Sequence, residues 1–295
     1  MAETHHFDAK SIYDFKDYVA VVTGGGTGIG LMITQALAAN GAKVYITGRR
    51  SEAIGNAAES HDPHQRGQII PLTTTDVTSK DELEKCVQDL QKREKYINLL
   101  VANAGASSPK AVPEHDDAGK LKDTLWNGES VEDWDDTFRT NVTSVYFTTV
   151  AFLPLLQAGM KPTGPLDRFG PSVIVTSSMS GIMRHAQGHF AYNASKAGTI
   201  HLTKLMSAEF QKAGIRVNSI APGYFPSEMT TKTSDERQKS NLEPGKVAEK
   251  GHVPAERGGS ELEMGMTAMF IARNHYLNGQ IIVVDGGVLN VVGGA

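Results

Sequence analysis

Two residues whose side chains can exchange a proton stand four positions apart in the stretch FAYNASKAGTI, residues 190–200. If this stretch is helical, positions i and i+4 share one face, and the phenol of Tyr192 lies beside the ammonium of Lys196. A free tyrosine has a pKa of about 10, too high for efficient proton transfer near neutral pH, and an adjacent cation lowers it by stabilising the phenolate. The pair is therefore either a contact on a helix surface or an acid–base group with the charge that tunes it.

A glycine-rich turn, VVTGGGTGIG at residues 21–30, lies between a β-branched run and a helical pattern that ends near Gly41. Glycine at such a turn lets the backbone approach a pyrophosphate, which the N-terminus of the following helix stabilises through its free N–H groups and its dipole. The turn therefore predicts a nucleotide site with contacts from Gly24, Gly26, Thr27, Gly28, Ile29 and Gly30.

Short runs rich in Val, Ile and Leu alternate with longer helical patterns along the chain. Runs that are apolar nearly throughout are typical of strands buried on both faces of a parallel sheet. We expect seven of them, at residues 18–24, 43–47, 68–74, 97–103, 172–178, 215–222 and 280–286. The sequence therefore predicts an α/β protein with one doubly wound, Rossmann-like domain over residues 1–295.

Three stretches interrupt this alternation. Residues 107–128 contain two prolines, two glycines and mixed charge, and are predicted to form an inserted surface loop. Residues 159–171 predict a second loop for the same reason. Residues 224–259 are charged and poor in apolar periodicity, which predicts a mobile segment at the substrate end of the site.

Composition excludes several kinds of partner. The chain has 295 residues, of which 40% are hydrophobic and 21% charged, as expected of a globular protein. Its net charge of −4 gives no basic footprint for nucleic acid and no polybasic membrane patch, so we expect a small-molecule partner. The single cysteine, Cys86, allows no intramolecular disulfide, and no stretch of about 18 apolar residues is present, so we expect a cytoplasmic protein.

Two pairs of residues invite readings that we reject. His185 and His189 have metal-like spacing, but no third ligand is evident, so we expect no metal and place them at the substrate mouth. Trp126 and Trp134 flank an acidic stretch, which argues against stacking on nucleic-acid bases and favours packing around the insertion.

The second predicted strand ends in YITGRR, residues 45–50. A carboxylate at this point would bind the ribose 2′-hydroxyl of NAD(H), and residues 43–50 contain none. Arg49 and Arg50 instead offer guanidinium groups suited to a 2′-phosphate. The sequence therefore favours NADP(H) over NAD(H).

Five further motifs follow the glycine turn: ANAG (102–105), SSMSG (177–181), YNASK (192–196), APGYFPSEMT (221–230) and YLNGQIIVVDGG (276–287). With these six motifs in this order, the chain resembles the short-chain dehydrogenase/reductase family along nearly its whole length. The stretch PGYFPSEMT is also similar to the 3-oxoacyl reductase-like branch of that family. The resemblance implies a Rossmann-like sheet of strand order 3-2-1-4-5-6-7 and a homotetramer or homodimer.

The resemblance also implies a catalytic tetrad. The catalytic serine of the family lies three residues before a glycine, and Gly181 selects Ser178 among its neighbours. In carbonyl reduction Tyr192 would protonate the substrate oxygen and Ser178 would hydrogen-bond it, while oxidation of an alcohol would reverse the transfer. The family's asparagine holds a water that links the lysine to solvent. The tetrad is then Asn141, Ser178, Tyr192 and Lys196.

The remaining site residues also follow from the resemblance. The cofactor would contact Tyr192 and Lys196 themselves, together with Asp76, Val77, Asn103, Ala104, Gly105, Pro222, Gly223, Phe225 and Ser227. Apolar and flexible side chains near the tetrad would form the substrate wall and suit a lipid-like ketone. These are Met179, Met183, Gln187, Phe190, Tyr224 and Met229.

We therefore expect an NADP(H)-dependent carbonyl reductase or secondary-alcohol dehydrogenase that acts on a small or lipid-like ketone or alcohol. Two alternatives stay open. One is an NAD-dependent alcohol dehydrogenase, and the other is a nucleotide-binding member of the family without redox turnover.

Overall fold

The structure is a computed structural model, which describes residues 7–61, 64, 66–113, 115–160, 170–228, 235, 238–240, 242, 245 and 247–292. Seven parallel strands form one sheet in the order β3-β2-β1-β4-β5-β6-β7, which confirms the expected topology. The strand order reverses between β1 and β4, and ligands of doubly wound sheets bind at such a switch point. The strands are β1 (Val19–Thr23), β2 (Lys43–Thr47), β3 (Gln68–Pro71), β4 (Leu99–Ala102), β5 (Ser172–Thr176), β6 (Arg216–Pro222) and β7 (Ile281–Val284).

The sheet is buried on both faces because its central strands are apolar on both. Every position of β1, β4, β5 and β6 is buried. In β1, Ala20 and Val22 face one core cluster, whereas Val19 and Val21 face the other. A strand has a side-chain period of two, so a continuous apolar run fills both cores.

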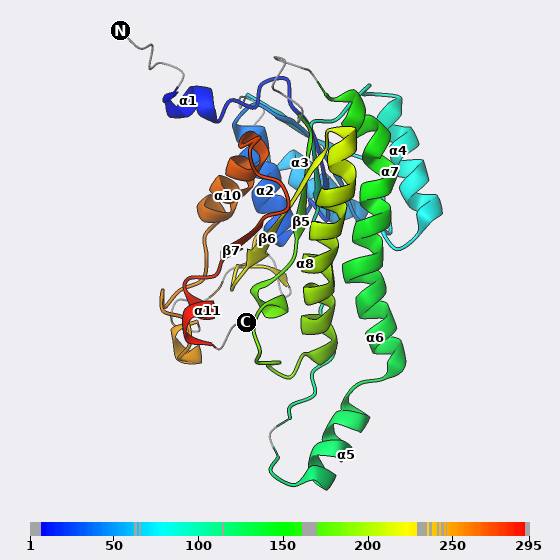
Figure 1. The fold of residues 1–295 in the computed structure, drawn as a ribbon. Helices are drawn as coiled ribbons and strands as arrows, with labels where there is room; N and C mark the ends of the chain where they lie inside the picture. The colour runs from blue at the N-terminus through cyan, green and yellow to red at the C-terminus, as the bar shows by residue number, and fades with distance from the viewer. Residues whose placement is uncertain are drawn as a thin grey trace.

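Helices cover both faces of the sheet (Figure 1). The helices α2, α3 and α10 pack on one face, and α4, α7 and α8 on the other. The described helices are α1 (Ala9–Ile12), α2 (Gly28–Ala39), α3 (Ser51–Glu59), α4 (Lys80–Gln91), α5 (Ala118–Gly128), α6 (Val131–Phe138), α7 (Ser144–Ala158), α8 (Phe190–Phe210), α10 (Glu261–Arg273) and α11 (Val288–Val291). Among them, none is both long and apolar enough to span a bilayer.

Four shorter helical turns complete the described secondary structure. One is a π-helix, η2 (Arg139–Thr143), which joins α6 to α7. The others are 3₁₀ turns, η3 (Met179–Gly181), η4 (Gln211–Ala213) and η5 (Ala248–Lys250).

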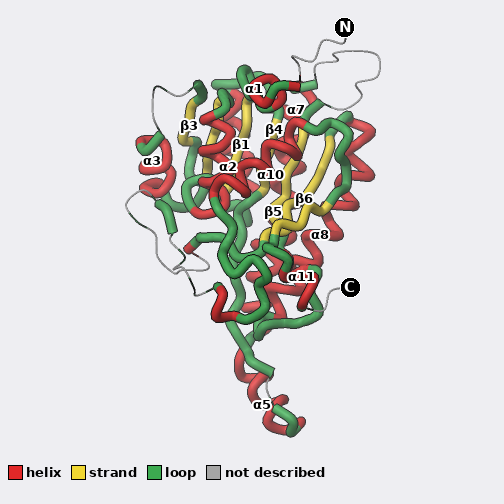
Figure 2. The backbone as a smooth tube through the Cα atoms, turned by 90° about the vertical axis from the view of Figure 1, so that its left-hand side faces the viewer, coloured by secondary structure: helices red, strands yellow, loops and turns green. Residues whose placement is uncertain are grey.

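The predicted surface loop at 107–128 differs from the structure, because its second half is the helix α5. This helix extends away from the rest of the molecule (Figures 1 and 2), and none of its residues is buried. Trp126 is 76% exposed and contacts Lys122, whose Nζ lies 5.9 Å from the ring centroid. Trp126 therefore does not pack as expected, whereas Trp134 stacks on Phe138 at 6.1 Å.

Part of the segment predicted to be mobile, residues 224–259, lies outside the described residues. These positions are 229–234, 236, 237, 241, 243, 244 and 246.

Candidate active site

A cavity of 1220 Å³ opens where the strands end. It is lined by residues that follow β1, β2, β3, β4, β5 and β6, and by the first turns of α8. Pockets for drug-sized ligands measure roughly 300–1,000 Å³, so this cavity has room for a dinucleotide and a second molecule. All but one of the predicted cofactor contacts line it, and the exception, Gly30, packs beneath the glycine turn.

The glycine turn has the geometry that a pyrophosphate site needs. Gly24 and Gly28 adopt left-handed conformations with φ of +63° and +51°. A Cβ on Gly30 would collide with the carbonyl oxygen of Gly24, so only glycine allows this approach. Thr27 precedes α2 without a side-chain cap, which leaves the N–H groups of this 12-residue helix available to an anion. The residues present therefore fit a dinucleotide.

The predicted arginines line the cavity after β2, on a segment that lies beside the glycine turn. Arg50 forms a bidentate ion pair with Glu228, with Nη2–Oε2 and Nη1–Oε1 distances of 2.7 and 3.1 Å. This hydrogen bonding raises the pKa of Arg50. Glu228 was missed by the sequence analysis, since it lies 178 positions away from Arg50.

Asp76 lines the same end of the cavity as an ionised carboxylate. Hydrogen bonds from the backbone N–H and hydroxyl of Thr78 hold its pKa below the usual range, and the charge of Arg49 lowers that pKa further. Asp76 also donates its backbone N–H to Glu82 at 2.6 Å. The loop after β3 is thus held both by its own residues and by the first turn of α4.

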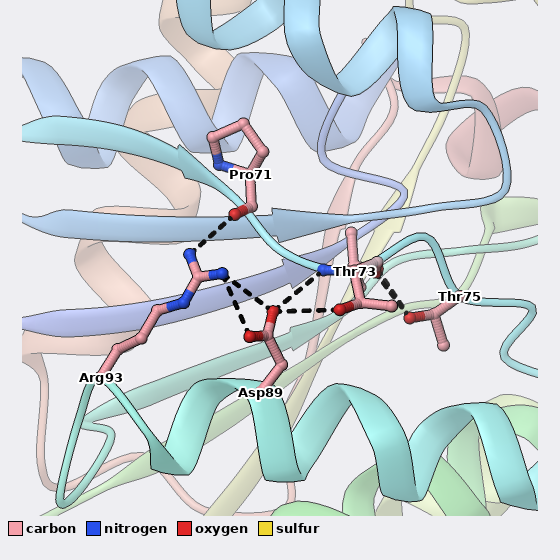
Figure 3. Close-up of polar contacts among 6 residues, drawn as sticks. Pro71, Thr73, Thr75, Asp89 and Arg93 are labelled. Carbon is pink, nitrogen blue, oxygen red and sulfur yellow. Dashed lines mark hydrogen bonds and ion pairs between the residues drawn. The ribbon is translucent and has the colours of Figure 1, made fainter.

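A second set of contacts, made by Asp89, also ties this loop to α4 (Figure 3). Asp89 accepts hydrogen bonds from the backbone N–H and hydroxyl of Thr73, at 3.3 and 3.0 Å. Arg93 donates to Asp89 and to the carbonyl oxygen of Pro71. Thr75, which lines the cavity, donates to the carbonyl oxygen of Thr73 at 2.9 Å. This network fixes the wall that Asp76 and Val77 contribute.

Asn103 joins the ends of three neighbouring strands. Its Nδ2 donates to the carbonyl oxygen of Thr23 at 3.1 Å, and its Oδ1 accepts from the hydroxyl of Thr176 at 3.1 Å. Two residues later, a Cβ on Gly105 would lie 3.1 Å from Asn141 Oδ1 and 3.5 Å from Lys196 Nζ. The ANAG motif therefore supports the cavity floor and leaves space for the side chains of Asn141 and Lys196.

The π-helical turn η2 contains Asn141 at its centre, and π-turns are frequent at functional sites. Asn141 is fully buried. Its Nδ2 donates to the carbonyl oxygen of Ala106 and to Ser195 Oγ, at 2.9 and 3.0 Å, and its Oδ1 accepts from the Ala106 N–H. Thr199 donates its hydroxyl to the Asn141 carbonyl at 2.8 Å. The side chain thus locks the loop after β4 to α8.

Tyr192 and Lys196 both lie on α8, as their spacing predicts. Lys196 is 4% exposed, its Nζ lies 5.7 Å from the Tyr192 ring centroid, and it donates to the carbonyl oxygen of Thr176 at 3.0 Å. Ser178 lines the same cavity two residues after β5, with its Oγ accepting from the Ser180 N–H at 3.1 Å. The structure therefore brings these three side chains together, with Asn141 behind them.

The pKa values of the pair reflect their burial. Burial lowers the pKa of Lys196 to about 8, because a low-dielectric site disfavours the charged form. Burial raises the pKa of Tyr192, and a hydrogen bond from Ser178 opposes that rise. This direction is opposite to the lowered pKa expected for Tyr192, because desolvation is the largest influence on the phenol.

The substrate end of the cavity is bounded by Met179, Gln187, Tyr224 and His189, as predicted. His185 and Phe190, which were also expected there, are not among the lining residues. Met183 does not line it, because its side chain packs in a small apolar cluster with Val247, Val253 and Val288. Met229 lies outside the described residues.

A chain of hydrogen bonds runs through Tyr224. Gln187 donates Nε2 to the Tyr224 hydroxyl at 3.1 Å, and His252 Nε2 lies 3.0 Å from the same oxygen. His252 Nδ1 lies 2.8 Å from the carbonyl oxygen of Lys250, which can only accept, so Nδ1 carries the proton in a neutral ring and Tyr224 donates to Nε2. The hydroxyl of Tyr224 is thereby held in one orientation. Among the described residues, no group of three or more His, Cys, Asp or Glu side chains could hold a metal ion.

A doubly wound sheet with a glycine turn at its switch point, and a tyrosine–lysine pair beside it, defines an oxidoreductase of the Rossmann type. The family model described as "short chain dehydrogenase" matches residues 18–238, and the chain belongs to this family.

Several known proteins are similar over almost the whole chain. The short-chain dehydrogenase/reductase PhomF of Diaporthe leptostromiformis is 40% identical over 287 residues, which cover 96% of this chain and 95% of PhomF. A rhamnolipid-biosynthesis 3-oxoacyl-[acyl-carrier-protein] reductase of Pseudomonas aeruginosa is 32% identical over 91% of this chain and 95% of its own. The solved Pseudomonas aeruginosa RhlG/NADP active-site complex has a TM-score of 0.75 and 30% identity, over 94% of this chain and 98% of that chain.

Proposed function

We propose that this protein is an NADP(H)-dependent carbonyl reductase, or in reverse a secondary-alcohol dehydrogenase, with Asn141, Ser178, Tyr192 and Lys196 as its catalytic tetrad. One observation carries the proposal. A buried ammonium, that of Lys196, lies 5.7 Å from the ring of a tyrosine in the same cavity as an uncapped, glycine-rich helix N-terminus. Acid–base and dinucleotide-binding groups thus share one site.

The nicotinamide cofactor supplies hydride to the substrate carbon when it is bound. Its pyrophosphate would lie on the N-terminus of α2, and its adenine between Asp76 and Val77. Its carboxamide would be held at Phe225 and Ser227. Ser227 packs against the glycine turn, since a Cβ on Gly28 would lie 3.0 Å from Ser227 Cβ, so this segment and the turn are already close.

The chain's own groups move the proton. Tyr192 donates its phenolic proton to the oxygen of the substrate carbonyl, and its raised pKa keeps it protonated until that step. Ser178 donates a hydrogen bond to the same oxygen and stabilises the charge that develops there. Lys196 then stabilises the phenolate, and Asn141 holds the water through which the proton returns.

Preference for NADP(H) is supported by Arg49 and Arg50, which both line the adenosine end of the cavity. A guanidinium binds a phosphate through paired, charge-assisted hydrogen bonds. The Pseudomonas aeruginosa relative whose structure is described as an NADP complex gives further support.

The substrate we propose is a small or lipid-like ketone. Met179 and Tyr224 offer apolar surface, while Gln187 and the Tyr224 hydroxyl offer polar contacts. The similarity to a 3-oxoacyl reductase fits such a substrate.

A homotetramer or homodimer is supported by apolar side chains on the outside of the fold. Leu262, Met266 and Phe270 recur every four residues on α10 and are 69%, 46% and 40% exposed. Val283, on the edge strand β7, is 40% exposed. Such a stripe beside a sheet edge suits burial against a second copy.

A ketone and alcohol panel assayed with NADPH, NADH and their oxidised forms tests the function. We expect turnover with NADPH at a kcat/KM at least about tenfold above that with NADH, the factor that one charge-assisted contact supplies. Higher activity with NADH would favour the NAD-dependent alternative. Tight NADPH binding with no turnover across the panel would favour the non-redox alternative.

A further inference from the structure

The ion pair between Arg50 and Glu228 crosses the cavity. Arg50 begins α3, next to the strand end where dinucleotide-binding folds read the adenosine ribose. Glu228 belongs to the segment after β6 and follows Ser227, which packs on the glycine turn. Both side chains line the cavity, so their contact joins two walls that the cofactor must occupy between them.

The geometry of this pair matches that of a phosphate contact. Two parallel N–H···O bonds of 2.7 and 3.1 Å use both terminal nitrogens of Arg50. A 2′-phosphate would engage the same fork of donors, because carboxylate and phosphate oxygens have similar spacing. The phosphate and the Glu228 carboxylate cannot both take these bonds, and their like charges repel at that distance.

We propose that Glu228 modulates the preference for NADP(H) over NAD(H) by competing with the 2′-phosphate for Arg50. This inference rests on the proposed NADP(H) site. NAD(H) carries a hydroxyl at this position and leaves the ion pair intact. Glu228 therefore weakens binding of NADP(H) without weakening binding of NAD(H), and it narrows the preference that the two arginines create.

The competition has a further consequence for the site. When a 2′-phosphate takes Arg50, the carboxylate of Glu228 loses its bonds to that fork, and Glu228 directly follows the proposed nicotinamide contacts Phe225 and Ser227 in the chain. Selection at the adenosine end is thereby linked to the reacting end of the cavity.

Binding titrations of NADP+ and NAD+ to Glu228→Gln test the proposal without relying on turnover. We expect the Kd for NADP+ to fall roughly three- to tenfold, the range for a partly exposed, charge-assisted pair. The Kd for NAD+ should stay within about twofold, because its 2′-hydroxyl does not compete for the fork. The gain should shrink as ionic strength rises to about 0.5 M. An unchanged or higher Kd for NADP+ would overturn the proposal.

Glu52→Gln is the matched control, because it removes one exposed carboxylate from the first turn of α3, two residues from Arg50, without touching the cavity. We expect it to change the Kd for NADP+ by less than about twofold. An equal gain from Glu52→Gln would mean that net charge alone is responsible, and would also overturn the proposal.

The variant Arg50→Gln separates this inference from the proposed function. In the Arg50→Gln background, Glu228→Gln should change the Kd for NADP+ by less than about twofold, since the contested fork is gone and only screened charge repulsion remains. If Arg50→Gln weakens NADP+ binding but Glu228→Gln has no effect, the inference fails and the NADP(H) site stands. If neither Arg49→Gln nor Arg50→Gln weakens NADP+ binding, the proposed cofactor preference itself fails.

Discussion

A cation is buried at the amino ends of the strands and another at their carboxyl ends, and the two differ in the number of their hydrogen-bond partners. Arg216 begins β6 at the amino edge, is fully buried, and donates to four carbonyl oxygens, those of Ile271, Ala272, Asn274 and Leu277. Lys196 lies at the carboxyl edge, is 4% exposed, and donates to one, that of Thr176. Within the described part of the chain, neither is paired with a carboxylate in an ion pair.

The difference separates a charge that holds the fold together from one that lines the cavity and can meet a substrate. Arg216 supplies donors to the last turn of α10, where helix carbonyls lack partners, so its hydrogen bonds hold α10 on the sheet. An ammonium has three N–H donors, and Lys196 uses one of them in a cavity that a substrate can enter. Burial lowers the pKa of Arg216 to about 10 and that of Lys196 to about 8. Only the second value allows titration near physiological pH.

Replacing Lys196 by Met should reduce activity far more than the same substitution at Arg216. The cation that stabilises the Tyr192 phenolate is lost, and we expect kcat at saturating NADPH to fall about 10³-fold, the middle of the range for acid–base catalysis. Steady-state reduction of the best ketone measures this. If the variant retained a tenth or more of the activity, Lys196 would have a structural role like that of Arg216.

Replacing Arg216 by Met should mainly affect the stability of the protein. Arg216→Met leaves four carbonyl oxygens without their donor, so we expect the free energy of unfolding to fall by about 3 kcal/mol. Lys196→Met removes a buried charge whose pKa is depressed, so we expect no loss, or a gain of about 1 kcal/mol at pH 7.

Urea unfolding of both Met variants checks this contrast. The folded pKa of Lys196 is about 8, below its ordinary value of 10.5, so its charge destabilises the fold below pH 8. Any gain from Lys196→Met should therefore disappear as pH rises from about 8 toward 10.5. If the two substitutions lowered the free energy of unfolding equally, the proposed difference between Arg216 and Lys196 would be contradicted.

The pH dependence of carbonyl reduction should report the Lys196 charge. We expect kcat/KM to be level below pH 8 and to fall roughly tenfold per pH unit above it, as the ammonium loses its proton. In Lys196→Arg the decline should move to higher pH, because a guanidinium stays charged. Equal profiles for the two proteins would show that another group titrates.

A smaller effect is expected at the substrate end. Tyr224→Phe removes the hydroxyl that Gln187 and His252 orient, and we expect KM for a polar ketone to rise roughly threefold to tenfold with little change in kcat. Phe190→Leu, on α8 but not among the cavity-lining residues, serves as the control. A fall in kcat without a change in KM would assign Tyr224 to the chemistry instead.

The sequence predicted most of the cofactor half because its signals are local. Seven apolar runs became the seven strands, since a run buried on both faces has no polar alternation to confuse its assignment. The glycine turn, the arginines after β2 and the spacing of Tyr192 and Lys196 each lie within one short segment.

The sequence did not reveal contacts between residues that are far apart in the chain. It also did not reveal a helix that buries none of its side chains. Glu228 pairs with a residue 178 positions away, and no local pattern marks that contact. Arg216 stands inside an apolar run, where a charge gives no sign of the four carbonyls that surround it. Helix α5 has glycines, charges and no buried side chain, so it carries too little apolar periodicity to be distinguished from a loop.

The central claim is that Tyr192 is the proton donor, and Tyr192→Phe tests it most directly. The substitution removes one hydroxyl and keeps the ring that packs beside Lys196. With the Kd for NADPH measured by titration and ketone reduction measured at saturating cofactor, we expect binding within about threefold of the unaltered protein and a loss of at least about 10³-fold in kcat. Full reduction by this variant would contradict the account.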